Sequence, residues 1–294
     1  MKTVVIGRGC VGSTLLHNIY KAGGVFSLVD EARFSRLSPL VFNGREMEVE
    51  TVTPSAAFEA DIIINTVKNF SLTGTFPLMD GFVGDNTVIL PLQNGLESED
   101  VIASRYGREK VVRAFISGLS TQREGGSVTS FSPGLITIGE DDGSVSGRIT
   151  KLSDFFSSTS QPFRISGDIR HDQWVKFMTN TCFNSLTALM GYDYGTFMAS
   201  SSLLRAVRIV AREVQLVAAA EGVTITSDDI ERMIRDSMSL PPKGRSSMAD
   251  DMAAGRRNEN GWFCGTLSAK AKKHGIKTPS SDLLYILLEA ESGR

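Results

Sequence analysis

A glycine-rich segment near the start of the chain has the spacing G-x-G-x-x-G. It follows an apolar run, Thr3–Ile6, and opens a helical pattern; its members are Gly7, Arg8, Gly9, Cys10, Val11 and Gly12. In such a turn the first glycine permits the tight bend, the second lets the backbone approach a pyrophosphate, and the third lets helix and strand pack closely. The strand–turn–helix context favours dinucleotide binding over a glycine turn without a ligand.

Acidic residues close the second predicted strand, Val25–Val29, near the spacing of about 20 residues that the dinucleotide motif requires. Asp30 and Glu31 stand there, and carboxylates in this position bind ribose hydroxyls and repel a 2′-phosphate. Three arginines, Arg8, Arg33 and Arg36, are close enough in sequence to receive a 2′-phosphate instead. The local chemistry therefore leans slightly towards NADH over NADPH, with solvated surface charges as the alternative.

Polar residues follow two further apolar strands. Lys68 comes after the run Asp61–Val67, and Asn94 comes after Thr87–Leu90. In open α/β sheets the ligand lies beyond the carboxyl ends of the strands. We therefore predict that Lys68 and Asn94 line the cofactor site; a surface lysine and a turn asparagine are the alternatives.

A polar stripe runs along one predicted helix in the second half of the chain. Lys176, Asn180 and Asn184 are spaced i, i+4, i+8, so they share one helical face, among apolar neighbours such as Phe177 and Phe183. Asparagine is a poor residue inside a helix because its side chain competes for backbone hydrogen bonds. The stripe therefore indicates a functional site, and a hydrogen-bonded contact between helices is the alternative.

The elements that position these residues change character along the chain. Up to about residue 166, apolar strands alternate with helical segments, which predicts an α/β fold with an N-terminal Rossmann doubly wound sheet. Arg45–Val52 fits a hairpin or edge strand, Val111–Ile116 a buried parallel strand, and Gly126–Gly139 antiparallel strands. From residue 167 to 294 long helical patterns dominate, at 171–190, 201–221, 227–238, 245–274 and 283–290. We predict a dinucleotide-binding domain at 1–166 and an all-helical substrate domain at 167–294.

Composition narrows the class of protein. The 294 residues are 41% hydrophobic and 22% charged with a net charge of −2, and no basic cluster suits nucleic-acid binding. No apolar stretch approaches the roughly 20 residues that span a membrane. Neither a disulfide framework nor a metal-binding spacing can be read from the three cysteines, Cys10, Cys182 and Cys264. A cytoplasmic enzyme without a metal is expected.

Several of these motifs, taken in order, resemble the ketopantoate reductase (2-dehydropantoate 2-reductase) family over essentially the full length. They are GRGCVG, NTVK with Lys68, LQNG with Asn94, KFMTNTCFNSLTALMG from Lys176, SSMADDMAAGRRNE with Ser247 and Glu259, and HGIKTP. The ordered set is more specific than any one motif. The resemblance implies reduction of a small 2-keto acid by a nicotinamide dinucleotide, NADPH in most relatives.

The resemblance also implies a role for each matching position. Lys176 would be the general acid that gives a proton to the ketone oxygen, a role open to a lysine whose pKa is shifted by partial burial. Asn180 and Asn184 would bind substrate oxygens, and Ser247 the substrate carboxylate. Glu259 would hold the distal hydroxyl and orient Lys176. Read alone, Ser247 is equally suited to cap a helix, and Glu259 to be a solvated charge.

The chain departs from the family at two places. Relatives usually follow the glutamate with an aliphatic, an acidic and an aromatic residue, whereas here Gly261 stands at the acidic position. Many relatives also place an arginine at the position of Glu31. Three hypotheses follow: reduction of ketopantoate to pantoate, reduction of another branched 2-keto acid, and a dinucleotide-binding sensor without turnover. The helical domain is a candidate for a homodimer interface.

Overall fold

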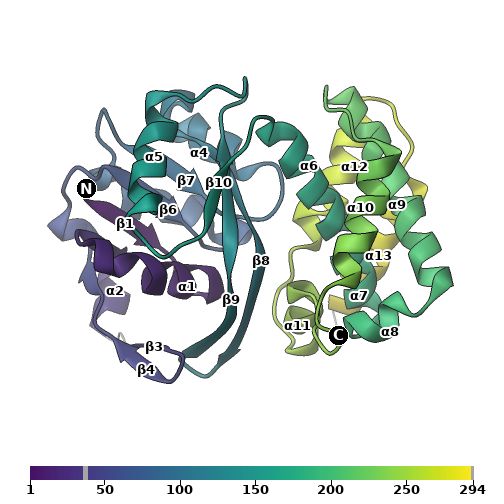
Figure 1. Ribbon diagram of the computed structural model, residues 1–294, viewed down its shortest axis with the longest axis horizontal. Helices are drawn as coiled ribbons and strands as arrows, with labels where there is room; N and C mark the ends of the chain where they lie inside the picture. Colours follow the sequence, from purple (N-terminus) through teal and green to yellow (C-terminus); the bar gives the residue numbers. More distant parts are fainter. Residues whose placement is uncertain (36–38, 293–294) are drawn as a thin grey trace. The chain divides into compact units, whose positions relative to one another are not determined.

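The computed structural model describes residues 1–35 and 39–292. The chain forms two compact units (Figure 1). The first contains Met1–Gln93 and Glu97–Ile169, and the second contains Asn94–Leu96 and Arg170–Arg294. The short segment Asn94–Leu96 thus belongs to the helical unit, although the chain on both sides of it belongs to the first unit.

A parallel five-stranded sheet forms the centre of the first unit, in the order β5-β2-β1-β6-β7. The strands are β1 (Thr3–Ile6), β2 (Val25–Leu28), β5 (Glu50–Val52), β6 (Ile62–Asn65) and β7 (Val88–Pro91). The helices of this unit are α1 (Cys10–Ile19), α2 (Glu31–Phe34), α3 (Phe76–Met79), α4 (Ser98–Tyr106) and α5 (Gly147–Ser157). The doubly wound α/β sheet predicted from the sequence is confirmed.

The sheet is apolar on both faces because each face is covered. Successive strand residues point to opposite sides, and along β1 Val5 joins one core cluster while Val4 and Ile6 join another. The first cluster includes side chains of α1 and α5, and the second includes Ile102 of α4. Continuous apolar runs in these strands are the expected signature of parallel strands buried on both sides.

A second sheet completes the unit. Its order is β10-β9-β3-β4, with β8 paired to β9. The strands are β3 (Leu40–Phe42), β4 (Arg45–Met47), β8 (Arg113–Glu124), β9 (Ser127–Gly139) and β10 (Phe163–Ile165). The prediction of a parallel strand at 111–116 holds only at its start, where Val111 forms a parallel bridge with Ile89; β8 begins at Arg113 and runs antiparallel to β9. The segment 45–52 divides: β4 forms a hairpin with β3, and β5 is the edge of the parallel sheet.

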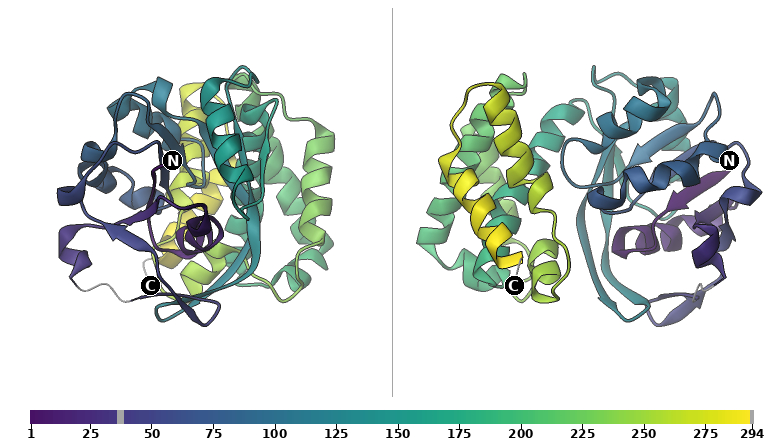
Figure 2. Two further views of the ribbon diagram at one scale, coloured as in Figure 1. Left: turned by 60° about the vertical axis from the view of Figure 1, so that its left-hand side comes forward. Right: turned by 180° about the vertical axis from the view of Figure 1, so that it is seen from behind.

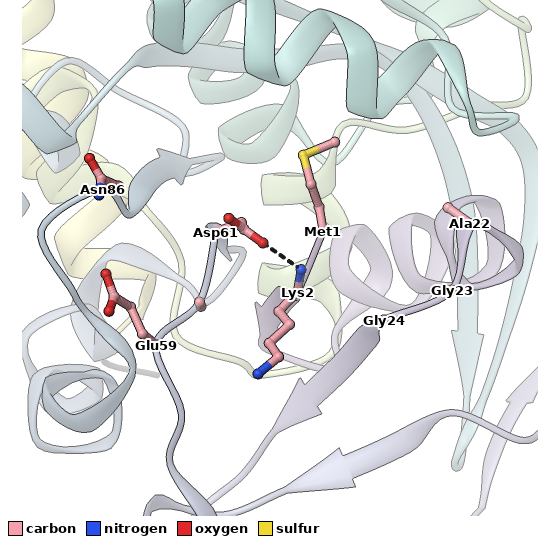
Figure 3. Close-up of a pocket in the computed structure, with 9 residues that line it drawn as sticks. Met1, Lys2, Ala22, Gly23, Gly24, Glu59, Asp61 and Asn86 are labelled. Carbon is pink, nitrogen blue, oxygen red and sulfur yellow. Dashed lines mark hydrogen bonds between the residues drawn. The ribbon is translucent and has the colours of Figure 1, made fainter.

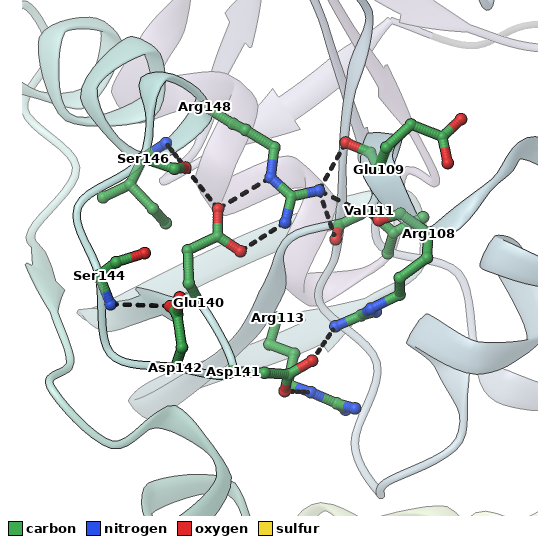
Figure 4. A network of polar contacts seen from close by, with 11 residues as sticks. Arg108, Glu109, Val111, Arg113, Glu140, Asp141, Asp142, Ser144, Ser146 and Arg148 are labelled. Atoms are coloured by element: carbon green, nitrogen blue, oxygen red, sulfur yellow. Dashed lines mark hydrogen bonds and ion pairs between the residues drawn. The ribbon is translucent and has the colours of Figure 1, made fainter.

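An ion-pair network fixes the end of β9 to the start of α5 (Figure 4). Arg148 binds Glu140 through Nε at 2.8 Å and also donates to the backbone carbonyl of Arg108 at 3.1 Å. Ser146 caps α5 and donates its hydroxyl to Glu140. One guanidinium thus joins the end of β9, the first turn of α5 and the connection before β8.

The second unit is helical, and several of its helices are visible from two sides in Figures 1 and 2. It consists of α6 (Ile169–Thr179), a π-helical turn (Asn180–Asn184), α7 (Ser185–Met190), α8 (Tyr194–Met198), α9 (Ser201–Ala220), α10 (Ser227–Met238), α11 (Ser247–Ala253), α12 (Cys264–Lys273) and α13 (Pro279–Ser292). No helix within residues 1–35 and 39–292 is long and apolar enough to span a membrane. The helical pattern at 245–274 is interrupted between α11 and α12 by a polar segment in which Asn258 Oδ1 accepts a hydrogen bond from the Asn260 amide.

A buried carboxylate joins α9 to α13. Glu213 accepts hydrogen bonds from the amides of Ser280 (2.9 Å) and Ser281 (2.8 Å) in the first turn of α13, and from the Ser281 hydroxyl (2.6 Å). These amides lack acceptors inside the helix, and the helix dipole favours a negative charge there. Glu213 thus caps α13 from a neighbouring helix.

We predict that Glu213→Ala destabilises the helical unit by about 2–4 kcal/mol, since it leaves the buried amide and hydroxyl of Ser281 without their acceptor and removes a charge-assisted cap. Thermal unfolding followed by circular dichroism measures this loss. Glu231→Ala is the matched control: its ion pair with Arg208 is exposed, so about 1 kcal/mol or less is expected. Equal effects of the two variants would contradict the capping role.

Candidate active site

The glycine-rich turn lies where the sequence predicts it, between β1 and α1. Thr66, just after β6, fixes the turn by donating its hydroxyl to the carbonyl oxygens of Ile6 (2.8 Å) and Gly7 (3.3 Å). A side chain at Gly12 would collide with the Gly7 carbonyl and lie 2.6 Å from Thr66 Oγ1. Gly12 is therefore required for the close packing of helix on strand. Thr66 belongs to the NTVK motif, but its anchoring role was not foreseen.

The same turn has open space at Gly9 and a positive charge at Arg8, and both suit an anion. A Cβ on Gly9, the residue that precedes α1, would meet no atom within 4 Å. Arg8 has a buried Nη1 atom without a hydrogen-bond partner in the part of the chain that the structure describes, and burial lowers the pKa of its guanidinium. An open glycine at a helix N-terminus beside an unsatisfied cation fits the phosphates of a dinucleotide.

The two glycines predict different outcomes when each is changed to alanine. Gly9→Ala adds a methyl group into open space, so we expect an unchanged thermal midpoint and a dinucleotide Kd raised about tenfold or more, since the backbone no longer approaches the phosphates. Gly12→Ala should instead lower the thermal midpoint, because its Cβ has no room. Fluorescence titration with NADPH and NADH provides the Kd. Wild-type affinity in a folded Gly9→Ala protein would contradict the placement of the phosphates.

The acidic residues after β2 are engaged locally. Asp30 caps α2 by accepting a hydrogen bond from the Arg33 amide at 2.8 Å, and it pairs with the Arg33 side chain at 3.3 Å. Glu31 accepts from the amide of Ser55 at 3.0 Å, and the Ser55 side chain and amide together lower the pKa of the Glu31 carboxyl. Arg36 lies outside the described residues. Asp30 thus caps α2, and its carboxylate partly neutralises the charge of Arg33.

Two buried amides organise the loops that follow β6 and β7. Gln93 donates its Nε2 to Asn65 Oδ1 at 2.8 Å and to the Val67 carbonyl at 3.1 Å. Asn65 in turn donates to Thr75 at 2.9 Å. These bonds position the half-buried Lys68, which begins a short 3₁₀ turn after β6. In the sequence, only the amide residues of the LQNG and NTVK motifs indicated this arrangement.

A hydrogen-bonded chain of side chains lies inside the helical unit. Asn184 donates to Asn180 Oδ1 at 3.1 Å, and Asn180 donates to Asn94 Oδ1 at 3.4 Å. Asn94 donates to Glu259 Oε2 at 3.3 Å. The structure therefore joins four residues that the sequence singled out. Asn94, which was expected to line the cofactor side, contacts two residues that were expected to serve the substrate.

A π-helical turn brings the asparagines into line. In an α-helix a residue four positions on overshoots the first by about 40°. Asn180–Asn184 forms a wider turn with less rotation per residue, which opposes that drift. Lys176, Asn180 and Asn184 thus stay nearer to one line than α-helical spacing allows. Such wide turns occur often at functional sites, and nothing in our reading of the sequence predicted this one.

Lys176 lies one turn before the amide chain and makes no hydrogen bond or ion pair with any residue that the structure describes. The side chain keeps some accessible surface, yet it is surrounded closely enough that burial lowers the pKa of its amine. Glu259 is buried and accepts from Asn94, and it does not bind Lys176 directly. Direct orientation of Lys176 by Glu259 remains a prediction.

Ser247 is exposed at the first position of α11. The residue that caps this helix is its neighbour Ser246, which is buried, accepts from the Ala249 amide at 3.2 Å and receives the Thr187 hydroxyl at 2.8 Å. The Ser247 hydroxyl is therefore not used as the cap, and its role with a substrate carboxylate remains a prediction.

A separate surface hollow of 560 Å³ lies at the opposite end of the parallel sheet (Figure 3). Residues next to the amino ends of the strands line it, among them Lys2, Gly24 and Asp61, and the Lys2 amide donates to Asp61 at 2.8 Å. Ligands of open α/β sheets bind beyond the carboxyl ends of the strands. This hollow is therefore not the dinucleotide site.

Comparison with known proteins agrees with this geometry. The model of ketopantoate reductase PanE/ApbA matches residues 3–143, and that of its C-terminal domain matches residues 168–292. The chain belongs to the ketopantoate reductase family. It is therefore an oxidoreductase. A 2-dehydropantoate 2-reductase from Archaeoglobus fulgidus is 27% identical over 299 residues, which cover 98% of this chain and 97% of the relative.

Solved structures show that the fold of this family is shared widely. D-mandelate dehydrogenase in complex with NADH and anilino(oxo)acetate has a TM-score of 0.87 at 23% identity, covering 99% of this chain and 98% of that one. A ketopantoate reductase from Staphylococcus aureus described as dimeric has a TM-score of 0.86 at 19% identity, covering 100% and 99%. At these identities the likeness concerns the fold.

Proposed function

We propose that this ketopantoate reductase family member reduces 2-dehydropantoate to pantoate with a reduced nicotinamide dinucleotide, and that Lys176 is the general acid. The observation that carries the proposal is an unpaired, desolvated lysine one helical turn from a chain of amides that ends at a buried glutamate. The relatives named 2-dehydropantoate 2-reductase support this substrate.

The residues of the glycine turn would hold the cofactor. Gly7, Gly9 and Gly12 with Cys10 and Val11 form the turn and first helical residues, Arg8 offers its charge to a phosphate, and Lys68, Asp30 and Glu31 complete this side. A bound cofactor would supply hydride to the carbonyl carbon of the substrate. Because Asp30 and Arg33 pair with each other, neither side chain decides between NADPH and NADH, and both cofactors are compared in the rate assay.

In the proposed mechanism Lys176 polarises the ketone oxygen and gives it a proton as the carbonyl carbon accepts hydride, which leaves a neutral amine and an alcohol. Water then returns a proton to the amine. Asn180 and Asn184 would donate to substrate oxygens, and Ser247 would bind the carboxylate. Glu259 would accept the distal hydroxyl, while Asn94 acts as a positioning residue between Glu259 and Asn180.

The segment after Glu259 favours a second class of substrate, because Gly261 stands where relatives usually carry an acidic residue. A Cβ on Gly261 would meet no atom within 4 Å. Arg257 lies over the Trp262 ring at 5.6 Å in the same segment. The missing acidic side chain favours another branched or aromatic 2-keto acid as the alternative substrate, in keeping with the aromatic ligand of the D-mandelate dehydrogenase structure.

Initial rates of NADPH and NADH oxidation with ketopantoate, 2-ketoisovalerate and phenylglyoxylate test these alternatives. A kcat/KM for ketopantoate at least tenfold above the other acids supports the proposal. A preference for another acid would replace the substrate and keep the mechanism. Tight dinucleotide binding without turnover of any acid would overturn both and favour a sensor.

We also propose that the chain forms a homodimer through its helical unit. The dimeric Staphylococcus aureus structure with the same fold supports this proposal. So do large apolar side chains exposed on the helical unit, because contiguous exposed apolar surface usually marks an interaction site.

A further inference from the structure

The last helix, α13, is apolar on two faces. Its inner face contributes Leu284 and Leu288 to the core of the helical unit. A second stripe at the helical spacing i, i+3, i+4, i+7 faces outward: Leu283 (57% exposed), Ile286 (62%), Leu287 (41%) and the exposed Ala290. Helices that are apolar all round are normally covered on both sides. In the view from behind, α13 crosses the near side of the helical unit with no other helix over it (Figure 2, right).

A second exposed apolar pair lies on α9, next to the start of α13. These residues are Ile209 (46% exposed) and Leu216 (57%). At about 100° per residue, both lie on the same side of Glu213, about 40° and 60° around the helix axis from it. Glu213 binds the first turn of α13. Ile209 and Leu216 therefore flank the N-terminus of α13. The outward faces of α9 and α13 belong to one region of the surface.

The charges beside the two apolar faces are complementary. On α9, Arg205 has no hydrogen bond or ion pair within the described residues, and Arg212 donates to the neutral side chains of Gln215 and Ser227. On α13, Asp282 accepts from Ser268 and Thr278, and Glu289 accepts from Asn260. Each of the two acids therefore has only neutral donors, and neither arginine is paired with a carboxylate.

The spacing of these charges also matches. Arg205 and Arg212 are seven residues apart, as are Asp282 and Glu289. Two helical turns separate the members of each pair by about 10.5 Å. Two helices packed side by side could therefore satisfy both ion pairs at once, with the apolar residues between them. Within one chain all four side chains are exposed.

We infer that α13 of one subunit packs against α9 of a second copy of this chain, and that a two-fold axis repeats the contact. A two-fold axis makes each patch meet its complement twice, which doubles the area that a single contact between α13 and α9 would bury. The acidic rim of α13 then faces the basic rim of α9. The inference builds on the proposed homodimer and names its surface.

Sedimentation equilibrium of the full chain tests the interface. The wild-type chain should be a dimer, and Ile286→Arg should raise the dimer Kd about a hundredfold or more, because it places a charge in the apolar centre. Met238→Arg, at an exposed residue on α10, is the matched control and should leave the Kd unchanged. Met238→Arg should keep the wild-type thermal midpoint, whereas Ile286→Arg should lower it only as far as loss of the dimer does, since both side chains are exposed within one chain.

A second variant tests the pairing of α9 with α13. Arg205→Glu combined with Arg212→Glu should raise the dimer Kd about tenfold or more, and high salt should weaken the wild-type dimer. A dimer sensitive to Ile286→Arg but not to the arginine reversals would overturn the α9–α13 pairing. A dimer insensitive to Ile286→Arg would overturn this surface and leave the homodimer standing. A monomeric wild type would overturn both, and the reductase assay is independent of either result.

Discussion

Replacing Lys176 with alanine should lower kcat for the accepted 2-keto acid by about 10²–10⁴-fold, the usual contribution of a positioned general acid. Within the described residues the Lys176 amine has no bond to a protein group, so its removal leaves no stranded partner. The dinucleotide Kd and the thermal midpoint should therefore stay close to the wild-type values. Stopped-flow absorbance at the reduced-nicotinamide band separates the chemical step from binding.

The pH profile gives a readout that a structural role would not change. Burial lowers the pKa of the Lys176 amine, so its proton-donating form is lost at lower pH than in an ordinary lysine. The reduction rate should be high below this shifted pKa and fall as the pH rises through it. Lys176→Arg serves as the control, because a guanidinium stays protonated and should remove this basic limb while lowering the rate. An unchanged basic limb in Lys176→Arg would assign it to another group.

The sequence predicted the parallel sheet well because its signal is local and strong. Runs such as Ile62–Ile64 are apolar at every position, as expected of a strand covered on both faces. The glycine turn was equally clear, since Gly12 has no room for a side chain. The direction of β8 was misjudged because only Val111 pairs with the parallel sheet, whereas Arg113–Glu124 pairs along its whole length with the next strand, β9; an antiparallel pairing leaves little trace in a short sequence window.

The sequence predicted which residues form the candidate site better than it predicted the contacts between them. The spacing of Lys176, Asn180 and Asn184 indicated one face, but the π-helical turn that aligns them depends on packing in the helical unit. Asn94 was assigned to the cofactor because it follows a strand. Its segment instead belongs to the helical unit, where Leu96 joins the core and Gly95, at φ = 106°, passes the Trp262 carbonyl closely. Such contacts between distant segments cannot be read from spacing.

Replacing Glu259 with glutamine tests whether the amide chain needs a fixed direction. A carboxylate only accepts hydrogen bonds, so Asn94 must turn its Nδ2 towards Glu259 and its Oδ1 towards Asn180, and the same constraint passes to Asn184. A glutamine can present either its oxygen or its amide nitrogen, so this constraint is lost. We expect Glu259→Gln to lower kcat/KM about 10²–10³-fold, as for the loss of an oriented donor in an active site.

Asn94 is the middle member of the hydrogen-bonded side chains that link Asn180 to Glu259. Asn94→Ala breaks the link in the middle and should lower kcat/KM about 10-fold to 10²-fold, while Glu231→Gln, on the surface of α10, should have no effect. Glu259→Gln keeps the size of the side chain, so its thermal midpoint and dinucleotide Kd should change little. If Asn94→Ala added its full loss to that of Glu259→Gln in the double variant, the two residues would act independently. A double variant no worse than Glu259→Gln alone is what one continuous chain requires.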